Sequence, residues 1–400
     1  MTDNKIAVTT VLGGVDVLTG HIYRTRASAS FAYSDSFLGR SDAFALAPSL
    51  PLFGGPQAIF PAYPFSDSAP DTWGRKVLNR AAGRQLDEIS LLLGVNDNGR
   101  QGATRFWSDG VAVADGEGVP GEHELSEVIR TADQVQRGEM DISDRQIRRL
   151  FRATGSLGGA RPKANVDRGG LLWLAKFPKP VGDEWNVIAW EAATLDLMKQ
   201  AGIQVAPHET KTFTVAGEDR TVLFLRRFDR TSSNVRIPYM SAMTALEAQD
   251  GSGGDWVDLV EWAHTYGADT KELWRRAVFG ALIGSVDDHL RNHGFLRKNG
   301  AWVLSPAFDV NPTPVANGSE HELGLDGVFD LSLKDFVDAN VLDLFDVSLV
   351  EQSGWLESLV GILAKAESRA IAHGADAHSA AMMTERFAAA MEDLKQVLGN

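Results

Sequence analysis

The spacing of apolar residues predicts strands in the first part of the chain and helices in the last. Residues 15–24 (VDVLTGHIYR) and 27–38 (ASASFAYSDSFL) are typical of short strands broken by Gly and Ser. Pro-rich irregular segments follow them. Residues 71–85 (DTWGRKVLNRAAGRQ) predict a helix that Asp71 or Thr72 would cap. From about residue 240 onward, helical patterns dominate.

The middle of the chain alternates between the apolar spacing of strands and that of helices. Residues 143–154 predict a helix, residues 170–178 (GLLWLAKFP) a short apolar strand, and residues 184–203 an amphipathic helix. Residues 208–230 predict a β-hairpin that turns at 216–219. Together these elements predict a twisted sheet with a helix packed against it.

Composition limits the classes of protein to consider. With 400 residues and 44% hydrophobic content, the chain can bury a large core, and its length suggests two or more structural units. The formal net charge of -14 repels nucleic-acid phosphate and anionic lipid. The absence of cysteine excludes disulfides and thiolate metal sites. Without a leader-like N-terminus or an apolar run of about 20 residues, we expect a cytoplasmic protein with no membrane span.

Three polar residues lie against apolar runs near the centre of the helical part. Asp287 and Asn292 are five positions apart, and a predicted hairpin over residues 293–309 ends at Asp309. Kinases need one Asp to accept the hydroxyl proton, and an Asn and a second Asp to hold Mg²⁺ on the phosphates. Oxygen ligands suit this hard cation. Taken singly, each residue fits a helix cap or a turn, but their order favours a kinase.

Residues upstream supply groups that could bind nucleotide phosphates. The Gly-rich turn at 155–164 (GSLGGARPKA) carries Lys163 near its end, and the backbone N–H groups of such turns can cradle phosphates. Lys176 ends the apolar strand, and Glu191 faces the core from its helix, where a carboxylate needs a cation. Kinases use a strand Lys paired with a helix Glu to seat the phosphates. A structural salt bridge explains this pair equally well.

The strand within VLFLRRFDR (residues 222–230) would lead into the segment that joins two lobes, where kinases bind adenine through main-chain groups. The chain therefore offers a Gly-rich loop, a strand Lys, a helix Glu, an inter-lobe strand, a D-x-x-x-x-N loop and an Asp after a hairpin. These six parts follow one another in kinase order, and we interpret the chain as a kinase.

These motifs resemble a known family. SLGGARPKA, LAKFP, RRFDR, DDHLRN and PAFDV together resemble the HipA family of bacterial serine/threonine kinases, the toxin half of toxin–antitoxin pairs. LAPSLPLF, SAPDTWGR and GRQGATRF resemble the N-terminal subdomain of that family, so the resemblance spans roughly residues 10 to 330. The DDHLRN run is also similar to the D-x-H-x-x-N loop of lipid kinases.

The resemblance implies a role for each matching residue. Asp287 would be the catalytic base, Asn292 and Asp309 would hold Mg²⁺, and Glu191 would form the ion pair with Lys176. ATP binding is implied for Gly158, Gly159, Ala160, Lys163, Lys176, Arg226, Phe228, His289, Asn292 and Asp309. Ser156 matches the serine that family members autophosphorylate, where a phosphate of roughly -1.5 to -2 charge should inactivate the enzyme by repulsion and by displacement of the ATP-binding loop. Taken without the resemblance, Ser156 is more simply a turn residue.

The chain departs from the family pattern at two positions. Arg226 stands before the RFDR motif, where well-known members have Glu, and this puts nucleotide contacts from that side chain in doubt. Asp288 follows Asp287, where other members have a small residue, so two acids compete for the role of base. The spacing to Asn292 favours Asp287.

The function implied by the resemblance is an ATP- and Mg²⁺-dependent serine/threonine protein kinase of toxin type. The family usually phosphorylates an aminoacyl-tRNA synthetase, which stalls translation and growth. The implied partners are a HipB-like helix-turn-helix antitoxin and, through it, operator DNA. The acidic charge agrees with DNA contact being mainly the task of the antitoxin.

Three alternative functions remain open. A small-molecule or lipid phosphotransferase would use the same catalytic residues, although the acidic chain argues against lipid. A degenerate kinase fold could act as a binding or repressor subunit. A metal hydrolase is the weakest alternative, because His289 and His293 lie four apart without a matching third ligand.

The expected architecture is α+β, with the two lobes of a HipA-like protein kinase. Residues 1–110 are expected to form a β-rich N-terminal subdomain, and residues 111–235 an N-lobe with the Gly-rich loop. Residues 236–400 are expected to form a mostly helical C-lobe with the catalytic loop and the metal site. ATP would lie between the lobes, and lobe closure would assemble the site.

Overall fold

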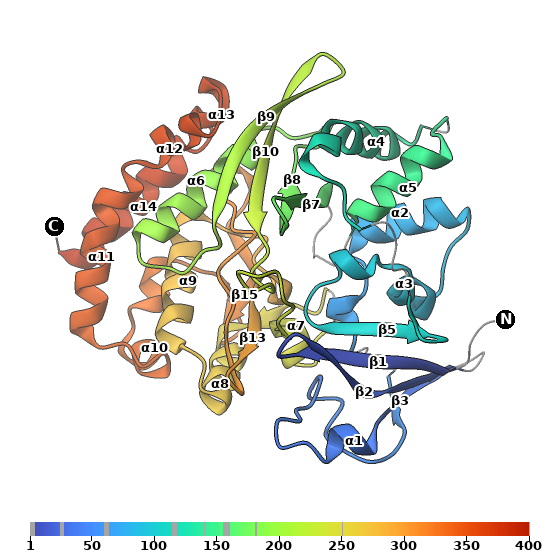
Figure 1. The fold of residues 1–400 in the computed structure, drawn as a ribbon. Helices are drawn as coiled ribbons and strands as arrows, with labels where there is room; N and C mark the ends of the chain where they lie inside the picture. Colours follow the sequence, from blue (N-terminus) through green and yellow to red (C-terminus); the bar gives the residue numbers. More distant parts are fainter. Residues whose placement is uncertain are drawn as a thin grey trace.

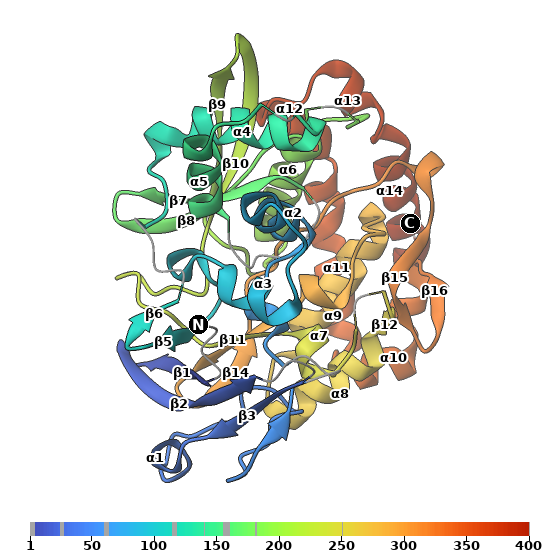
Figure 2. The same cartoon turned by 90° about the vertical axis from the view of Figure 1, so that its right-hand side faces the viewer.

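The computed structural model describes residues 5–24, 28–59, 64–113, 118–139, 141–154, 161–180, 182–249 and 251–399. Figures 1 and 2 show the fold in two views. Within those ranges, no helix combines the length and the apolar character that crossing a bilayer demands.

The N-terminal part is built on a six-stranded sheet in the order β4-β3-β2-β1-β5-β6. Its strands are β1 (Lys5–Leu12), β2 (Val15–Arg24), β3 (Ala29–Tyr33), β4 (Gln57–Ala58), β5 (Thr104–Ser108) and β6 (Val111–Ala112). The strand expected over residues 27–38 is shorter, because Ser34 caps a turn of helix, α1 (Asp35–Leu38). Two further helices, α2 (Thr72–Ala82) and α3 (Glu88–Gly94), follow β4. Asp71 caps α2, as predicted.

The second sheet has the order β7-β8-β10-β9. Its strands are β7 (Lys163–Arg168), β8 (Leu171–Lys176), β9 (His208–Val215) and β10 (Glu218–Arg226), and its helices are α4 (Leu125–Arg137), α5 (Asp144–Ala153) and α6 (Val187–Gln200). The predicted hairpin of β9 and β10 is present, with its turn at Ala216 and Gly217. α6 is buried almost all round because it lies between this sheet and the C-terminal helices, where Trp190 stacks on Phe387 at 5.5 Å.

The C-terminal part is mostly helical, with two three-stranded sheets. Their strands are β11 (Tyr239–Ser241), β13 (Gly294–Lys298) and β14 (Ala301–Leu304) in one, and β12 (Gly254–Asp255), β15 (Glu320–Leu325) and β16 (Val328–Asp330) in the other. The helices are α7 (Ala242–Ala245), α8 (Trp256–Tyr266), α9 (Thr270–Ile283), α10 (Ala339–Leu344), α11 (Leu349–Leu363), α12 (Ala366–Ala372), α13 (Ala377–Ala381) and α14 (Thr384–Leu398). The predicted hairpin before Asp309 is β13–β14.

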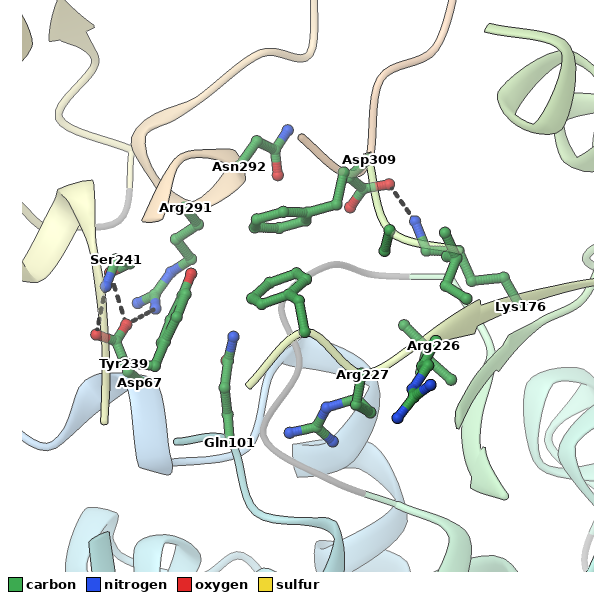
Figure 3. Close-up of a pocket in the computed structure, with 15 residues that line it drawn as sticks. Asp67, Gln101, Lys176, Arg226, Arg227, Tyr239, Ser241, Arg291, Asn292 and Asp309 are labelled. Carbon is green, nitrogen blue, oxygen red and sulfur yellow. Dashed lines mark hydrogen bonds and ion pairs between the residues drawn. The ribbon is translucent and has the colours of Figure 1, made fainter. Parts of the chain in front are cut away.

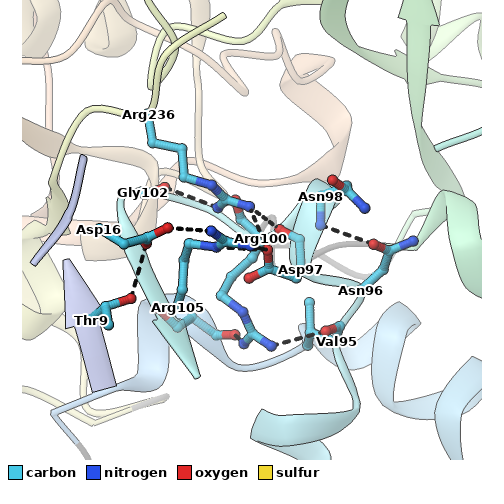
Figure 4. Close-up of polar contacts among 12 residues, drawn as sticks. Thr9, Asp16, Val95, Asn96, Asp97, Asn98, Arg100, Gly102, Arg105 and Arg236 are labelled. Atoms are coloured by element: carbon cyan, nitrogen blue, oxygen red, sulfur yellow. Dashed lines mark hydrogen bonds and ion pairs between the residues drawn. The ribbon is translucent and has the colours of Figure 1, made fainter. Parts of the chain in front are cut away.

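A largely buried set of arginines and aspartates joins the N-terminal part to the segment after β10. We call it the hinge cluster, and its members are Asp97, Arg100, Arg227, Asp229, Arg230 and Arg236. Arg227 donates to Gly99 O at 3.0 Å, and Arg230 donates to Arg100 O at 2.8 Å. Figure 4 shows the Asp97 side of this cluster, where Arg236 and Arg105 meet the same carboxylate. The N-terminal part is therefore fixed to the segment that joins the lobes.

Candidate active site

Lys176 lies at the centre of a charged cluster between the second sheet and the C-terminal part. It ends β8, and its Nζ donates to Glu191 Oε1 at 2.6 Å and to Asp309 Oδ1 at 2.6 Å. Glu191 comes from α6 and is almost completely buried, which agrees with the core-facing position that its helix predicted. Burial disfavours the ammonium, but Asp309 and Glu191 outweigh it and raise the pKa of Lys176. The lysine is therefore held in its charged form.

Asp309 follows the β13–β14 hairpin and turns its carboxylate toward Lys176 (Figure 3). Its backbone has a φ of 59°, a left-handed conformation that Asp adopts more readily than most residues. Burial works against its charge, yet Lys176 and Lys163 lower the pKa of the carboxyl to about 2. Asp309 is therefore an anion at neutral pH, and 26% of its side chain remains exposed.

The loop after α9 carries Asp287 and Asn292. The helix ends at Gly284, which has a left-handed backbone, and the loop then leads into a short 3-10 turn, η4 (Leu290–Asn292). Asn292 Nδ2 donates to the backbone O of Asp287 at 3.0 Å, so the amide oxygen of Asn292 is left for other partners. Asp287 is an exposed residue, but the surrounding chain still covers part of it, and this partial burial raises the pKa of its carboxyl. The charges of Asp309 and Glu322 raise the pKa further.

Asp288, the competing acid, is engaged elsewhere. Its Oδ1 lies 2.9 Å from His293 Nε2, and His293 is buried against the ring of Trp256. This pairing favours Asp287 as the base. His289 and His293 flank a short 3-10 turn, at its N-cap and C-cap positions, rather than lying within an α-helix.

Lys163 lies beside Lys176. The two lysines are direct partners in the antiparallel pairing of β7 with β8, so both side chains point to the same face of the sheet. Lys163 Nζ lies 3.0 Å from Asp71 Oδ2, and both side chains are buried. The sequence predicted Asp71 only as a helix cap. The signal that could have revealed its second role is the placement of an acid in the SAPDTWGR motif.

A pocket opens next to this cluster (Figure 3). Its apolar walls come from Leu174, Ala206, Leu225, Phe228 and Phe308. The rings of Phe228 and Phe308 are 5.2 Å apart between centroids.

The remaining predicted residues differ in their relation to this pocket. Arg226 lines it and donates to Thr231 O at 3.3 Å. Asn292 and Asp309 line it as well, whereas His289 does not. Nδ1 of His289 is buried without a hydrogen-bond partner, and its ring acts electrostatically on Asp287 and Asp309. Four predicted residues, Ser156, Gly158, Gly159 and Ala160, lie outside the described residues.

Sequence reasoning missed the far end of the pocket. Asp67 accepts hydrogen bonds from Ser241 N at 2.8 Å and Ser241 Oγ at 2.6 Å, and Arg291 approaches the same carboxylate at 3.9 Å. Gln101 and Tyr239 line the same end. Asp67 and Gln101 come from the N-terminal part, in segments without helical or strand periodicity, so no sequence pattern could have placed them here.

The acid and amide groups fit a divalent cation that carries phosphates. Asn292 and Asp309 present oxygen atoms to the pocket, and Mg²⁺ is usually bound by one or two carboxylates together with substrate phosphates. In the described part of the chain, no group of three or more His, Asp or Glu side chains is gathered as a ligand set of its own. The arrangement therefore suits a cation that arrives with its ligand.

Comparisons with known proteins agree with this geometry. The family model for the HipA-like C-terminal domain matches residues 155–352. Toxin YjjJ of Escherichia coli K12 is 25% identical over 197 residues, which cover 44% of this chain and 43% of YjjJ. A Haemophilus influenzae Rd protein is 28% identical over 157 residues, which cover 34% of this chain and 45% of its own length. The matches thus span less than half of each curated relative.

The fold extends beyond the matched family region. A chain from the solved complex of HipA, HipB and operator DNA of the Shewanella oneidensis MR-1 toxin–antitoxin system superposes with a TM-score of 0.69 at 17% identity. The superposition covers 98% of this chain and 97% of that one. The predicted α+β, two-lobed HipA-like fold is therefore confirmed.

Proposed function

We propose that this chain, whose residues 155–352 form a HipA-like C-terminal domain, transfers the γ-phosphoryl group of Mg²⁺-bound ATP to a protein hydroxyl. The observation that carries the proposal is the position of Lys176, which joins Glu191 and Asp309 at 2.6 Å each beside the loop of Asp287 and Asn292. This combination of a strand lysine, a helix glutamate and two loop acids with an amide is what phosphoryl transfer requires.

The residues of the chain divide the chemistry among themselves. Asn292 and Asp309 would hold Mg²⁺, which neutralises charge on the phosphates when bound. Lys176, kept charged by its two acids, donates to phosphate oxygens. The apolar walls between Leu174 and Phe308 would cover the adenine ring, and main-chain groups near Arg226 and Phe228 would bind its edge.

Asp287 is the proposed general base. It is exposed, so an incoming hydroxyl can reach it, and its backbone O accepts a hydrogen bond from Asn292, which lines the pocket. A carboxylate with a raised pKa is also a better proton acceptor than an ordinary aspartate. The proton of the attacking hydroxyl passes to Asp287 as the oxygen bonds to phosphorus and ADP departs.

The finer assignment follows the family resemblance. We propose serine/threonine specificity, an aminoacyl-tRNA synthetase as target, inhibition of translation and growth, and autophosphorylation at Ser156. We also propose a HipB-like antitoxin as partner, operator DNA bound through that antitoxin, and a cytoplasmic location. This chain shares the fold of a chain in the solved complex of HipA, HipB and operator DNA, and this likeness supports the choice of partner.

The test is transfer of ³²P from labelled ATP with Mg²⁺ to the protein itself. The wild type should incorporate label, and Asp287→Asn should lower the rate by about 10²–10⁴-fold, the range for loss of a general base. Asp343→Asn, which changes an exposed acid on α10, is the matched control and should keep the wild-type rate. Full activity in Asp287→Asn would contradict the proposed role.

A further inference from the structure

Asp71 belongs to the N-terminal part of the chain, yet its carboxylate reaches the catalytic cluster. One oxygen, Oδ1, accepts a hydrogen bond from Gly74 N at 2.6 Å and so caps α2. The other, Oδ2, lies 3.0 Å from Lys163 Nζ. The side chains of Asp71 and Lys163 are 6% and 7% exposed, so the pair is almost completely withdrawn from water.

The partner of Asp71 is part of the proposed phosphate site. Lys163 and Lys176 are cross-strand partners on one face of the sheet, and the charges of both lysines lower the pKa of Asp309. Burial raises the pKa of the Asp71 carboxyl, Lys163 works against that rise, and the charge of Asp309 adds to it, so Asp71 is electrostatically part of the cluster. Two ammonium groups and three carboxylates, those of Asp71, Glu191 and Asp309, thus share one buried region.

The start of α2 also touches the other end of the Gly-rich turn. A Cβ added at Gly74 would lie 2.9 Å from Pro70 Cβ and 3.2 Å from Thr154 Cγ2, so glycine at this position lets the start of α2 lie against Thr154 without crowding. Thr154 is buried and directly precedes the predicted Gly-rich turn, and Lys163 lies near the end of that turn. The first turn of α2 therefore contacts the chain on both sides of the proposed phosphate loop.

A buried ion pair is a costly way to join two segments. Desolvation of both charges offsets much of their attraction, and apolar residues of similar size usually serve stability as well or better. An ammonium has three N–H donors, so an ion pair with Asp71 does not by itself prevent Lys163 from donating to a phosphate oxygen. The pair is therefore better explained by a need for an aimed cation than by a need for stability.

We propose that Asp71 is a positioning residue that holds the Lys163 ammonium toward the nucleotide phosphates, so that the N-terminal part of the chain helps to build the ATP site. This inference rests on the proposed function, because it assigns Lys163 to the phosphates. Asp71 itself touches neither nucleotide nor acceptor; it acts through Lys163.

The test compares the binding of Mg·ATP and of adenosine to the full chain by calorimetry. Asp71→Asn keeps a side chain that caps helices well but removes the charge that aims Lys163. It should weaken Mg·ATP binding by roughly tenfold or more, the scale of a charged hydrogen bond. Adenosine affinity should stay within about twofold, because adenosine has no phosphate. A purely structural role would move both ligands together or neither.

Two further variants complete the design. Asp87→Asn caps α3 in the same part of the chain and loses its ion pair with Arg24, so it should change neither affinity. In a Lys163→Met background, Asp71→Asn should have no further effect on Mg·ATP affinity. If Asp71→Asn alone does not fold, the double variant, which removes both buried charges, should match Lys163→Met for both ligands.

The possible failures are distinguishable. Wild-type chain that binds neither Mg·ATP nor adenosine would overturn the proposed function, and this inference with it. Wild-type chain that binds both, with Asp71→Asn unchanged for Mg·ATP, would overturn the positioning role alone. Tighter Mg·ATP binding by Asp71→Asn would overturn it too, because it would show that Asp71 competes with the phosphates for Lys163.

Discussion

The hinge cluster and the catalytic cluster are both built from buried acids and bases, but they satisfy their charges differently. In the hinge cluster, Asp229 accepts hydrogen bonds from Arg227, from Arg230 and from the backbone N of Gly102, and only 1% of its side chain is exposed. In the catalytic cluster, Asp309 meets Lys176 and keeps 26% of its side chain exposed. The first carboxylate is saturated by the protein, and the second retains capacity for a ligand.

This difference separates a structural role from a functional one more clearly than burial or charge alone. Burial opposes ionisation in both places, and neighbouring cations overcome it in both, so both aspartates have lowered pKa values. What distinguishes Asp309 is the open pocket in front of it, with Asn292 beside it. Variants in the two clusters should therefore fail in different ways.

The largest expected effect is on the rate of phosphoryl transfer in Asp309→Asn. Loss of a metal-binding carboxylate removes several kcal/mol of transition-state stabilisation, so the rate should fall by roughly a thousandfold or more. The midpoint of urea unfolding should change little, because Lys176 keeps Glu191. Initial rates and urea curves on the same preparation check both statements. A large loss of stability would show that Asp309 has a structural role, like the aspartates of the hinge cluster.

The converse substitution, Asp229→Asn, should lower the free energy of unfolding. It leaves Arg227 and Arg230 buried without their anion, which costs about 3–5 kcal/mol when one partner of a buried pair is removed. Urea unfolding followed by circular dichroism measures the change, with Asp343→Asn as the exposed control. A variant as stable as the wild type would show that the hinge cluster is not needed to hold the N-terminal part in place.

The acid limb of the pH–rate profile should report Asp287. The pKa of this carboxyl is raised from its ordinary 3.8, and a base must be ionised to accept a proton. Activity should therefore be constant above that raised pKa and fall as the pH drops through it. Rates of ³²P transfer at saturating Mg·ATP give the profile. An acid limb at or below 3.8 would indicate another base.

How far the sequence predicts the site depends on how local each contact is. Lys176 and Glu191 were paired correctly because a strand end and a core-facing helix position lie 15 residues apart and point at each other. The β13–β14 hairpin that returns Asp309 was predictable from its alternation and its turn. The two-lobed fold followed from the order of these parts and from the family resemblance.

Contacts between distant segments were not predictable. Asp67 and Asp71 reach the site from the N-terminal part. Their partners, Ser241 and Lys163, lie far away in the sequence, and no local pattern links them to these acids. Such contacts depend on how the sheets pack, which one sequence does not encode in its local pattern.

The smallest expected effect concerns Arg226, where the chain departs from the family pattern. Among the described residues its guanidinium donates to Thr231 O, and main-chain groups are expected to bind the adenine. Arg226→Ala should therefore change adenosine affinity by about threefold or less, comparable to an ordinary surface substitution. Calorimetric titration measures this change. A much larger loss would mean that the arginine itself contacts the nucleotide.

The central claim is that the cleft beside Lys176 binds ATP through a magnesium ion held by Asn292 and Asp309. Its most direct test is calorimetric titration of the wild type and of Asp309→Asn with ATP, with and without Mg²⁺. The account predicts that Mg²⁺ strengthens ATP binding to the wild type and has little effect on the variant. ATP binding that is absent, or that is equally strengthened by Mg²⁺ in both proteins, would contradict it.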